Sequence, residues 1–284
     1  MKHNIKAIAA FLLALLLLAG CGANAAPAVT AAPPQTTPET QAPVTVPVQS
    51  LPPETEPATE ATEPFQVETR PVITEPQTTV TVRTPDEFLA AIAPNTEIVV
   101  DAALIDWSKA SGYGTGKGEY YYWYEAYDGP ELYITGVSNL TIRGSGDDRT
   151  ANVLSAVPRY ANVLTFVNCS SIMVQGLTAG HVEEPGACIG GVLCFQNSQD
   201  ILVENCGLFG CGTLGVMGLS SKNMQIVSNE IYECSVGGVE FTNCDDVNVD
   251  GNTFRDLGGP EFRVYGCGTI TCNGETVHDF SPRQ

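Results

Sequence analysis

The stretch "MQIVSNEIYEC" at residues 224–234 decides the fold, because its pattern of apolar positions recurs along the chain. The same pattern appears earlier in "ILVENCGLFGC" (201–211) and later in "VNVDGNTFRDL" (247–257), so its start advances by the same 23-residue offset each time. A further copy, "ITCNGETVHDF" (270–280), keeps this offset. Self-similarity at a fixed period of about 20 to 50 residues is typical of solenoids, in which each repeat stacks on its neighbour.

This constant offset predicts apolar columns along the solenoid. These columns are Leu208, Ile231, Phe254 and Val277; Cys188, Cys211, Cys234, Leu257 and Phe280; and Leu193, Val216, Val239 and Phe262. Two earlier copies, "LTIRG" from Leu140 and "IMVQG" from Ile172, lie 32 and 29 residues upstream of the next copy. These longer spacings indicate insertions in two turns.

Two solenoids use repeats of this length, the leucine-rich repeat and the right-handed parallel β-helix. The piece M-x-I-x-x-N-x-I at 224–231 fits the leucine-rich pattern, but that pattern needs another Leu where this chain has Ser198, Ser221 and Cys244. It also needs a helical half, where this chain has "FGCGTLGVMGLSSKN" (209–223). Glycine and β-branched residues suit strands and turns. We therefore predict an all-β fold, a right-handed parallel β-helix.

A polar column supports this prediction, because Asn side chains on consecutive turns can hydrogen-bond along a stack. Its members are Asn168, Asn197, Ser220 and Asn243. The segments "NCSSIMVQG", "NSQDILVEN", "SSKNMQIVSNEI" and "NCDDVNVDGNTF" resemble the pectate-lyase-like family of right-handed β-helix repeat proteins, over roughly residues 138–280.

The hexapeptide "DVNVDG" at 246–251 matches the start of an EF-hand calcium loop. The twelfth position, however, is Leu257 instead of the bidentate Glu that closes such a loop. In the 23-residue register both valines point inward, so Asp246 and Asp250 lie on one strand, about 13 Å apart. They cannot converge on one ion, and we interpret the hexapeptide as a strand.

The beginning of the chain predicts export. Lys2 and Lys6 precede an apolar run that is too short for a stable membrane span. The end of this run, "LAGC" at 18–21, resembles the bacterial lipobox, which implies that Cys21 becomes the lipidated first residue of the mature protein. Ordinary cleavage without a lipid is the alternative. We expect a protein held at the bacterial cell surface, in contact with the membrane through the lipid anchor only.

We predict three segments: a lipoprotein signal peptide at 1–20, a linker at 21–78 and the β-helix domain at 79–284. The linker is rich in Pro, Thr, Ala and Glu and has too few apolar residues to build a core. Proline keeps such a chain extended, so the linker should act as a spacer.

The stretch "RTPDEFLAAIAPNTEIVV" (83–100) predicts a short helix at the start of the domain. Thr84 is the expected N-cap, Pro85 occupies the first helical position and Glu87 completes a capping box. A solenoid end exposes its core and needs such a cap.

Charge and cysteine usage exclude other classes. The formal net charge of -19 makes nucleic acid a poor partner, because nucleic-acid binding rests on clustered Lys and Arg. The chain has 10 cysteines and no CxxC pair, which argues against zinc. Lipidation of Cys21 would leave an odd number, which argues against a complete disulfide framework. We interpret the cysteines of the repeats as small buried apolar residues, and partial disulfides stay open.

Two outward rows define the main candidate site. The 23-residue offset aligns Phe209, Tyr232, Arg255 and His278 in one row and Gly210, Glu233, Asp256 and Asp279 in the next. Carboxylates on successive turns lie about 4.8 Å apart and repel one another unless they stay solvated, pair with cations or hold a metal ion. The aromatic faces suit stacking on sugars, and the carboxylates suit hydrogen bonds, acid/base work or Ca²⁺. A solvated charged corner is the alternative.

This site carries most of our residue predictions. We assign catalysis to Arg255, Asp256 and Glu233, calcium to Glu233, Asp256 and Asp279, and substrate contact to Phe209, Tyr232 and His278. Polysaccharide lyases of the superfamily that the chain resembles use carboxylate-bound calcium with an Arg or Lys base. The resemblance therefore implies the same roles for Arg255 and its carboxylates.

Two further segments are candidates. The insertion "GHVEEPGA" (180–187) carries His181, Glu183 and Glu184, to which we assign substrate contact, with a plain polar loop as the alternative. The segment "GYGTGKGEYYYWYEAYDG" (112–129) offers aromatics that stack on sugars or cap the first turn. No Ser/His/Asp constellation can be assigned.

The sequence thus predicts a cell-surface lipoprotein whose β-helix binds polysaccharide, with a uronic-acid polymer among the candidates. Whether it also cleaves the polymer, as a lyase or a hydrolase, stays open. The alternative is a non-catalytic adhesion or structural protein.

Overall fold

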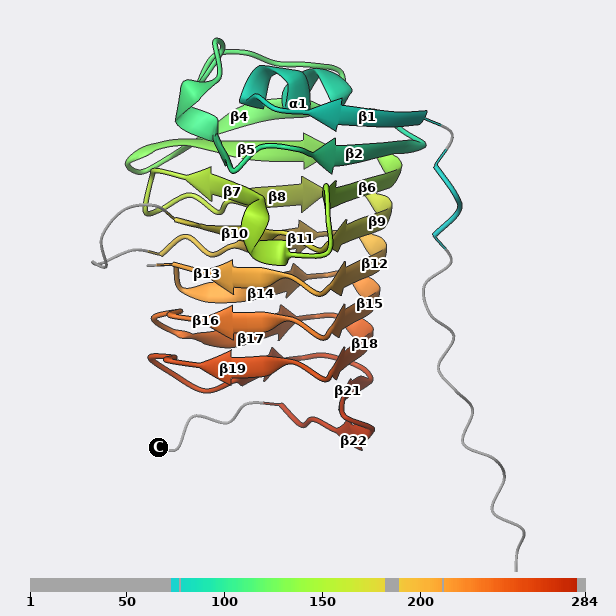
Figure 1. Ribbon diagram of the computed structural model, residues 1–284. Coiled ribbons are helices and arrows are strands. Elements are labelled where there is room, and N and C mark those ends of the chain that lie inside the picture. Colours follow the sequence, from blue (N-terminus) through green and yellow to red (C-terminus); the bar gives the residue numbers. More distant parts are fainter. Residues whose placement is uncertain (1–72, 77, 182–188, 211, 280–284) are drawn as a thin grey trace, which may run out of the picture. The chain divides into compact units, whose positions relative to one another are not determined.

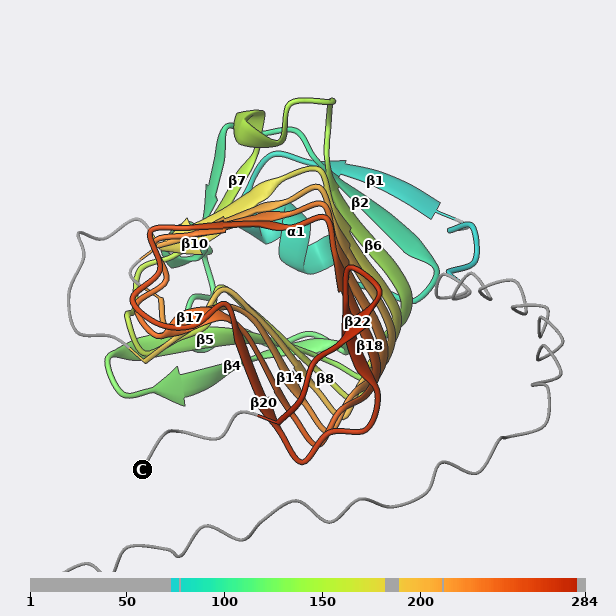
Figure 2. The ribbon, with the colours of Figure 1, turned by 90° about the horizontal axis from the view of Figure 1, so that it is seen from below.

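The computed structural model describes residues 73–76, 78–181, 189–210 and 212–279, all within the compact unit Pro64–Gln284. This unit is a parallel β-helix, as predicted: three sheets run along it, and successive turns stack (Figure 1). The view along the stack shows the three-sided cross-section (Figure 2). No helix in the described part of the chain is long and apolar enough to cross a membrane.

Each sheet is built mainly from parallel strands that follow one another at intervals of one turn, and β4 and β22 add antiparallel edge strands to two of the sheets. The first sheet, sheet A, has the order β1 (Thr78–Val82), β2 (Thr96–Val100), β6 (Ser138–Gly144), β9 (Ser170–Gln175), β12 (Gln199–Glu204), β15 (Lys222–Val227), β18 (Asp245–Asp250), β21 (Ile270–Cys272) and β22 (Glu275–Thr276). Sheet B has β3 (Leu104–Asp106), β7 (Val153–Ala156), β10 (Thr178–His181), β13 (Gly207–Phe209), β16 (Glu230–Tyr232) and β19 (Thr253–Arg255). Sheet C has β4 (Tyr121–Ala126), β5 (Gly129–Thr135), β8 (Leu164–Val167), β11 (Leu193–Gln196), β14 (Leu214–Leu219), β17 (Gly237–Thr242) and β20 (Phe262–Tyr265). The helical elements are α1 (Pro85–Ala91), η1 (Trp107–Lys109) and η2 (Arg149–Ala151).

The strand register confirms the predicted offsets. Met224 pairs with Val247, Ile231 with Phe254 and Val216 with Val239, each at the offset that the repeat predicts. The longer turns also pair as expected, with Ile172 opposite Ile201 and Leu140 opposite Ile172. Apolar side chains at these inward positions stack into one continuous core.

The segment "DVNVDG" is a strand, β18, as predicted. Val247 and Val249 are buried, whereas Asp246 is exposed and Asn248 and Asp250 are half-buried. Burial of alternate residues follows from the period of two along a strand.

The column of Asn168, Asn197, Ser220 and Asn243 has a different role from the predicted side-chain ladder. Its members have φ values of 54°, 49°, 50° and 53°, in the left-handed region that Asn tolerates better than most residues. They turn the corner from sheet C to sheet A. One residue later, Ser198 N donates to Ser221 Oγ at 3.1 Å, a bond from backbone to side chain. Among the described residues, side-chain hydrogen bonds between Asn residues of neighbouring turns stand at other positions: Asn139 Nδ2 donates to Asn95 Oδ1 at 3.1 Å, and Asn229 Nδ2 donates to Asn252 Oδ1 at 3.0 Å. Stacked Asn side chains thus occur as predicted, but not in the predicted column.

The N-terminal end is covered by the predicted helix. Thr84 accepts a hydrogen bond from Glu87 N at 3.2 Å, and Pro85 stands in the first turn. The carboxylate of Glu87 accepts from Arg83 N instead of the N-cap N–H that a capping box uses. Phe88 on the buried face of this helix packs against Trp107, with ring centroids 5.0 Å apart.

The aromatic segment 112–129 also contributes to this end. Its strand β4 runs antiparallel to β5 at the edge of sheet C. Trp123 packs toward the core, whereas Tyr122 and Tyr124 stay exposed. The segment thus caps the first turn and still presents tyrosine rings to solvent.

The C-terminal end corrects one prediction. After β21 the chain folds back into β22, and Cys272 pairs antiparallel with Glu275. Asn273 and Gly274 have φ values of 49° and 80°, as a two-residue type I′ hairpin requires. The fourth copy of the repeat therefore stops after its first strand. Val277 packs against the core but does not extend the column of Phe254 on sheet B.

A buried carboxyl group lies on the outer face of sheet C. Glu131 is 5% exposed, and its Oε1 accepts hydrogen bonds from Thr165 Oγ1 at 2.5 Å and Asn162 Nδ2 at 2.8 Å. Burial raises the pKa of Glu131 above its ordinary value of 4.5, against the opposing effect of these hydrogen bonds. Asn162 in turn accepts from Gly191 N at 2.7 Å, so this cluster ties three segments together.

Glu131→Gln is expected to change the pH dependence of stability. A raised folded-state pKa contributes stability below the unfolded pKa, and this stability is lost as pH rises through the folded pKa. The neutral amide should remove that loss, because it needs no ionisation. We expect the melting temperature of Glu131→Gln, relative to the parent, to rise between pH 4 and pH 7. Thermal melts at several pH values check this, and a constant difference would contradict it.

Candidate functional site

Three of the four predicted members of the aromatic row lie in register on the outer face of sheet B. Phe209 pairs with Tyr232, and Tyr232 with Arg255. The rings of Phe209 and Tyr232 stack with centroids 5.5 Å apart, and the Arg255 guanidinium lies 3.8 Å from the Tyr232 ring centroid. Tyr232 therefore has a neighbour on each face, and a sugar could reach only the ring edge.

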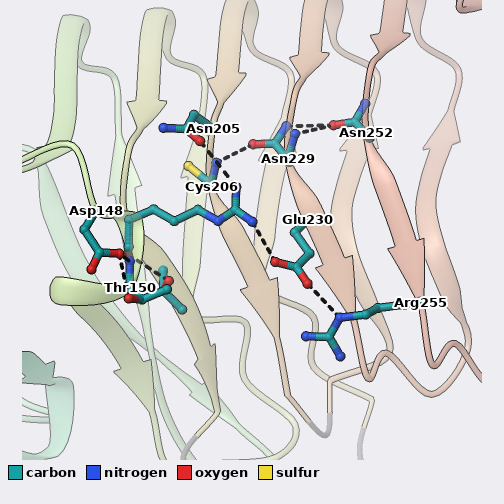
Figure 3. Close-up of polar contacts among 10 residues, drawn as sticks. Asp148, Thr150, Asn205, Cys206, Asn229, Glu230, Asn252 and Arg255 are labelled. Atoms are coloured by element: carbon teal, nitrogen blue, oxygen red, sulfur yellow. Dashed lines mark hydrogen bonds and ion pairs between the residues drawn. The ribbon is translucent and has the colours of Figure 1, made fainter.

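Glu230 lies at the centre of a charge network beside this row (Figure 3). Its carboxylate binds Arg149 Nη2 at 2.6 Å and Arg255 Nε at 2.6 Å, and Arg255 Nη1 also binds Asp256 at 3.0 Å. Arg149 reaches Asn205 Oδ1 at 3.3 Å as well. Two arginines thus meet two carboxylates, and the network is neutral overall.

The network sets the protonation of its members. The hydrogen bond from Arg255 holds the pKa of Glu230 below its usual range, and the same contact raises the pKa of Arg255. A general base must give up its proton near the working pH. The carboxylates around Arg255 raise its pKa and so favour the protonated form, whereas the role of a base, which the resemblance implies, needs the deprotonated form.

The second predicted row is only partly formed. Glu233 and Asp256 occupy equivalent corner positions on neighbouring turns, with φ values of 57° and 53°. Glu233 N donates to Arg255 O at 3.3 Å, which joins the two turns. His278 and Asp279 leave both rows, because the Asn273–Gly274 hairpin redirects the chain. The carboxylate of Asp279 accepts from Gly266 N at 3.3 Å instead.

The described residues do not fit a calcium site made of three carboxylates. Among them, no group of three or more His, Cys, Asp and Glu side chains lies close enough together to hold a metal ion. Calcium usually takes 6 to 8 oxygen ligands. Calcium binding in this row stays a prediction that rests on Glu233 and Asp256 alone.

His181 ends β10 and is almost completely buried. Its Nε2 lies 2.9 Å from Ala161 O, while Nδ1 has no hydrogen-bond partner among the described residues. Burial lowers the pKa of His181, which favours the neutral ring. The burial leaves little of the ring for a substrate. Glu183 and Glu184 lie outside the described residues, as does Cys21.

A groove of about 670 Å³ lies where sheet A turns into sheet B, at the ends of four successive sheet A strands. It is lined by Arg143, Gly144, Gln175, Gly176, Glu204, Asn205 and Ser228 from these turns, and by Gly146 and Asp147 from a loop. Polar side chains alternate with glycines in this lining, and Arg143, Gln175 and Glu204 stand at equivalent positions of three successive turns. This groove was missed in the sequence interpretation.

The loop at 145–152 forms one wall of the groove and is internally fixed. Asn152 Oδ1 accepts from Ser145 N at 3.0 Å, and Asp148 Oδ1 accepts from Thr150 N at 2.9 Å. The side chain of Arg149 in this loop donates hydrogen bonds to Asn205 and Glu230, which lie on two other turns. A signal for it existed, because this loop accounts for most of the extra length of the 32-residue turn that starts at Leu140.

The arginines near these surfaces are already paired. Arg143 binds Glu97 at 2.6 Å. Arg149 and Arg255 share Glu230. The groove therefore offers hydrogen-bonding groups more than free positive charge.

Residues 129–281, which include most of the solenoid, match the family model of the right-handed β-helix region. The chain belongs to the right-handed β-helix family. No curated protein sequence matches the chain.

Solved structures with a similar arrangement include three bacterial right-handed β-helix neighbours. A proposed glycosyl hydrolase from Parabacteroides merdae shares 9% identity, covers 69% of this chain and 99% of its own, and has a TM-score of 0.40. An alginate lyase from Paenibacillus sp. shares 14% identity, covers 67% of this chain and 65% of its own, and has a TM-score of 0.37. A pectate lyase from Paenibacillus sp. shares 9% identity, covers 71% of this chain and 79% of its own, and has a TM-score of 0.35. At these identities the likeness concerns the fold alone.

Proposed function

We propose that the chain is a cell-surface lipoprotein whose β-helix binds a polysaccharide in the groove between sheets A and B. The groove itself carries this proposal, because it presents Arg143, Gln175 and Glu204 at equivalent positions of three successive turns, with Ser228 on the turn that follows. Turns repeat every ~4.8 Å along the solenoid. A linear polymer with a repeating set of hydroxyl groups would meet the same kind of hydrogen-bond partner at each step.

The charges favour a neutral polymer over the uronic-acid polymer. The chain has 32 acidic and 13 basic residues, so a polyanion meets long-range repulsion. Arg143 and Arg149 line or border the groove, but their guanidinium groups are bound to Glu97 and Glu230. A uronic-acid polymer would have to displace these partners or bring its own cations.

Binding without cleavage is the form of this function that the geometry supports best. Arg255 is kept protonated by Glu230, and the aromatic rings beside it stack on each other. Cleavage by a lyase or a hydrolase, and a purely adhesive or structural role, are the alternatives. The lipid anchor at Cys21 and the linker to residue 78 would hold the groove away from the membrane.

Gly146→Trp is expected to weaken binding of a neutral polysaccharide at least about tenfold, a loss equivalent to 1.4 kcal/mol. A Cβ atom added at Gly146 meets no atom within 4 Å, so the new ring should enter the groove without disturbing the fold. Leu219→Trp is the matched control, because Leu219 is an exposed residue of sheet C. Calorimetric titration of the purified chain with neutral and uronic-acid oligosaccharides measures both affinities.

The same titration separates the alternatives. Tighter binding of uronic-acid oligosaccharides than of neutral ones would contradict the proposal of a neutral ligand. Equal affinity of Gly146→Trp and Leu219→Trp for the neutral oligosaccharide would contradict the proposal that the ligand binds in the groove. No binding of any glycan would favour an adhesive or structural protein. Repeating the titration with calcium and with a chelator tests the predicted role of Glu233 and Asp256, and an assay for the unsaturated product tests cleavage.

A further inference from the structure

The corner from sheet C to sheet A carries a column of hydroxyl and thiol groups, one for each turn. Its members are Cys169, Ser198, Ser221, Cys244 and Cys267. The backbone N of a residue on one turn donates to the side chain below it: Cys169 N to Ser198 Oγ at 3.1 Å and Ser198 N to Ser221 Oγ at 3.1 Å. Cys244 N donates to Cys267 Sγ at 3.2 Å in the same way. Cys267 thus takes the place that serine has higher in the column.

Cys244 and Cys267 are held in register from both sides. Thr242 pairs with Tyr265 before the corner, and Val247 pairs with Ile270 after it. The two cysteines are therefore one strand spacing apart, ~4.8 Å between Cα atoms. This value lies in the range of about 4.4 to 6.8 Å that disulfides span.

The two sulfur atoms also point the same way. Cys244 Sγ lies 3.5 Å from Thr242 O, and Cys267 Sγ lies 3.5 Å from Tyr265 O, the carbonyl two residues earlier in each case. Cys267 Sγ also lies 3.3 Å from Phe241 O, on the turn of Cys244. Both thiols are free in this structure.

We propose that Cys244 and Cys267 are a thiol pair that a low-molecular-weight disulfide oxidises to a disulfide, which ties the last complete turn to the turn before it. This modification is independent of the polysaccharide proposal.

The reaction begins at Cys267. This thiol is partly exposed, whereas Cys244 is buried, and burial raises the pKa of Cys244 to about 11. The Cys267 thiolate attacks one sulfur of the small disulfide, forms a mixed disulfide and releases one small thiolate. Cys244 then loses its proton and attacks Cys267 Sγ, which releases the second small thiolate. Two protein thiols are oxidised, and one small disulfide is reduced to two thiols.

The position of the pair explains what the bond would do. Cys267 joins β20 to β21, the last strands of sheets C and A before the terminal hairpin. A terminal repeat of a solenoid has a stabilising neighbour on one side only. The N-terminal end is covered by α1, whereas β19 and β20 are the last strands of their sheets. A bond between these two neighbouring turns would resist opening of this end.

Oxidation of the full chain tests the proposal. After treatment with oxidised glutathione, non-reducing peptide mapping with fragment sequencing should find a Cys244–Cys267 cross-link. The melting temperature should rise by about 5 to 10 °C over the reduced chain. In Cys267→Ser the cross-link and this rise should be lost, while the serine keeps the acceptor found at Ser198 and Ser221 in the same column.

Cys272→Ser is the matched control, because Cys272 is also a half-buried thiol and lies only five residues further along the chain. It should keep both the cross-link and the rise. The proposal is overturned if Cys267 pairs with Cys272, if it stops at the mixed disulfide with glutathione, or if Cys267→Ser shows the same rise as the parent.

Discussion

Replacing Ile226 with Asp is expected to lower the free energy of unfolding by about 4 kcal/mol or more. Ile226 is fully buried on β15, between Val203 above and Val249 below. A carboxylate there has no cation to pair with, and burying an unpaired charge costs several kcal/mol. Domains are stable by about 5 to 15 kcal/mol, so much of the solenoid should unfold in milder denaturant.

Gln225→Asp is the matched control, because it introduces the same side chain one position earlier. Gln225 is half-buried on the outer face of sheet A. A carboxylate there stays in contact with water, so a change within about 1 kcal/mol is expected. Denaturant titrations of the two variants measure the difference, and similar midpoints would contradict the inward and outward assignment of β15.

That assignment shows what periodicity can predict. An apolar residue at a fixed offset must face the core of every turn, so the offset between Met224 and Val247 fixes the register of whole sheets. The apolar columns of sheets B and C over the complete turns and the two insertions follow from the same reasoning. The capping helix follows from its own signals, Thr84 and Pro85. Cys188, Cys211 and Phe280 of the remaining column lie outside the described residues.

The predictions failed where a local preference overrides the repeat. The letters after Ile270 still match the apolar pattern, but Asn273–Gly274 favours a two-residue hairpin more strongly than the pattern favours another turn. This dipeptide was readable in the sequence. Because the repeat was extended past this dipeptide, His278 and Asp279 were assigned to rows that they do not join.

The groove illustrates a different limit. Its wall depends on Arg149, whose side chain reaches Asn205 and Glu230 on two other turns. These contacts join residues 56 and 81 positions apart, at no multiple of the repeat. The spacing of 32 residues revealed an insertion, but not where its side chains would bind.

The last prediction concerns the N-terminal end, where Trp107→Ala is expected to cost about 3 to 5 kcal/mol. Trp107 is 2% exposed, packs against Phe88 of α1 and donates from Nε1 to Val163 O at 2.8 Å. Alanine removes the ring that fills the space between the helix and the first turns, and it leaves a buried carbonyl oxygen without this donor. The first turns should therefore open before the rest of the solenoid.

Trp107→Phe separates packing from the hydrogen bond. Phenylalanine keeps a ring against Phe88 and loses only the donor to Val163 O, so about 1 to 2 kcal/mol is expected. Denaturant titration gives the two free energies, and hydrogen exchange shows where the chain opens. Loss of protection in β1, β2 and β6 before β15 and β18 would support a cap that protects the open end of the stack. Uniform loss along all turns, or equal costs for the two variants, would show that Trp107 does not close this end through packing.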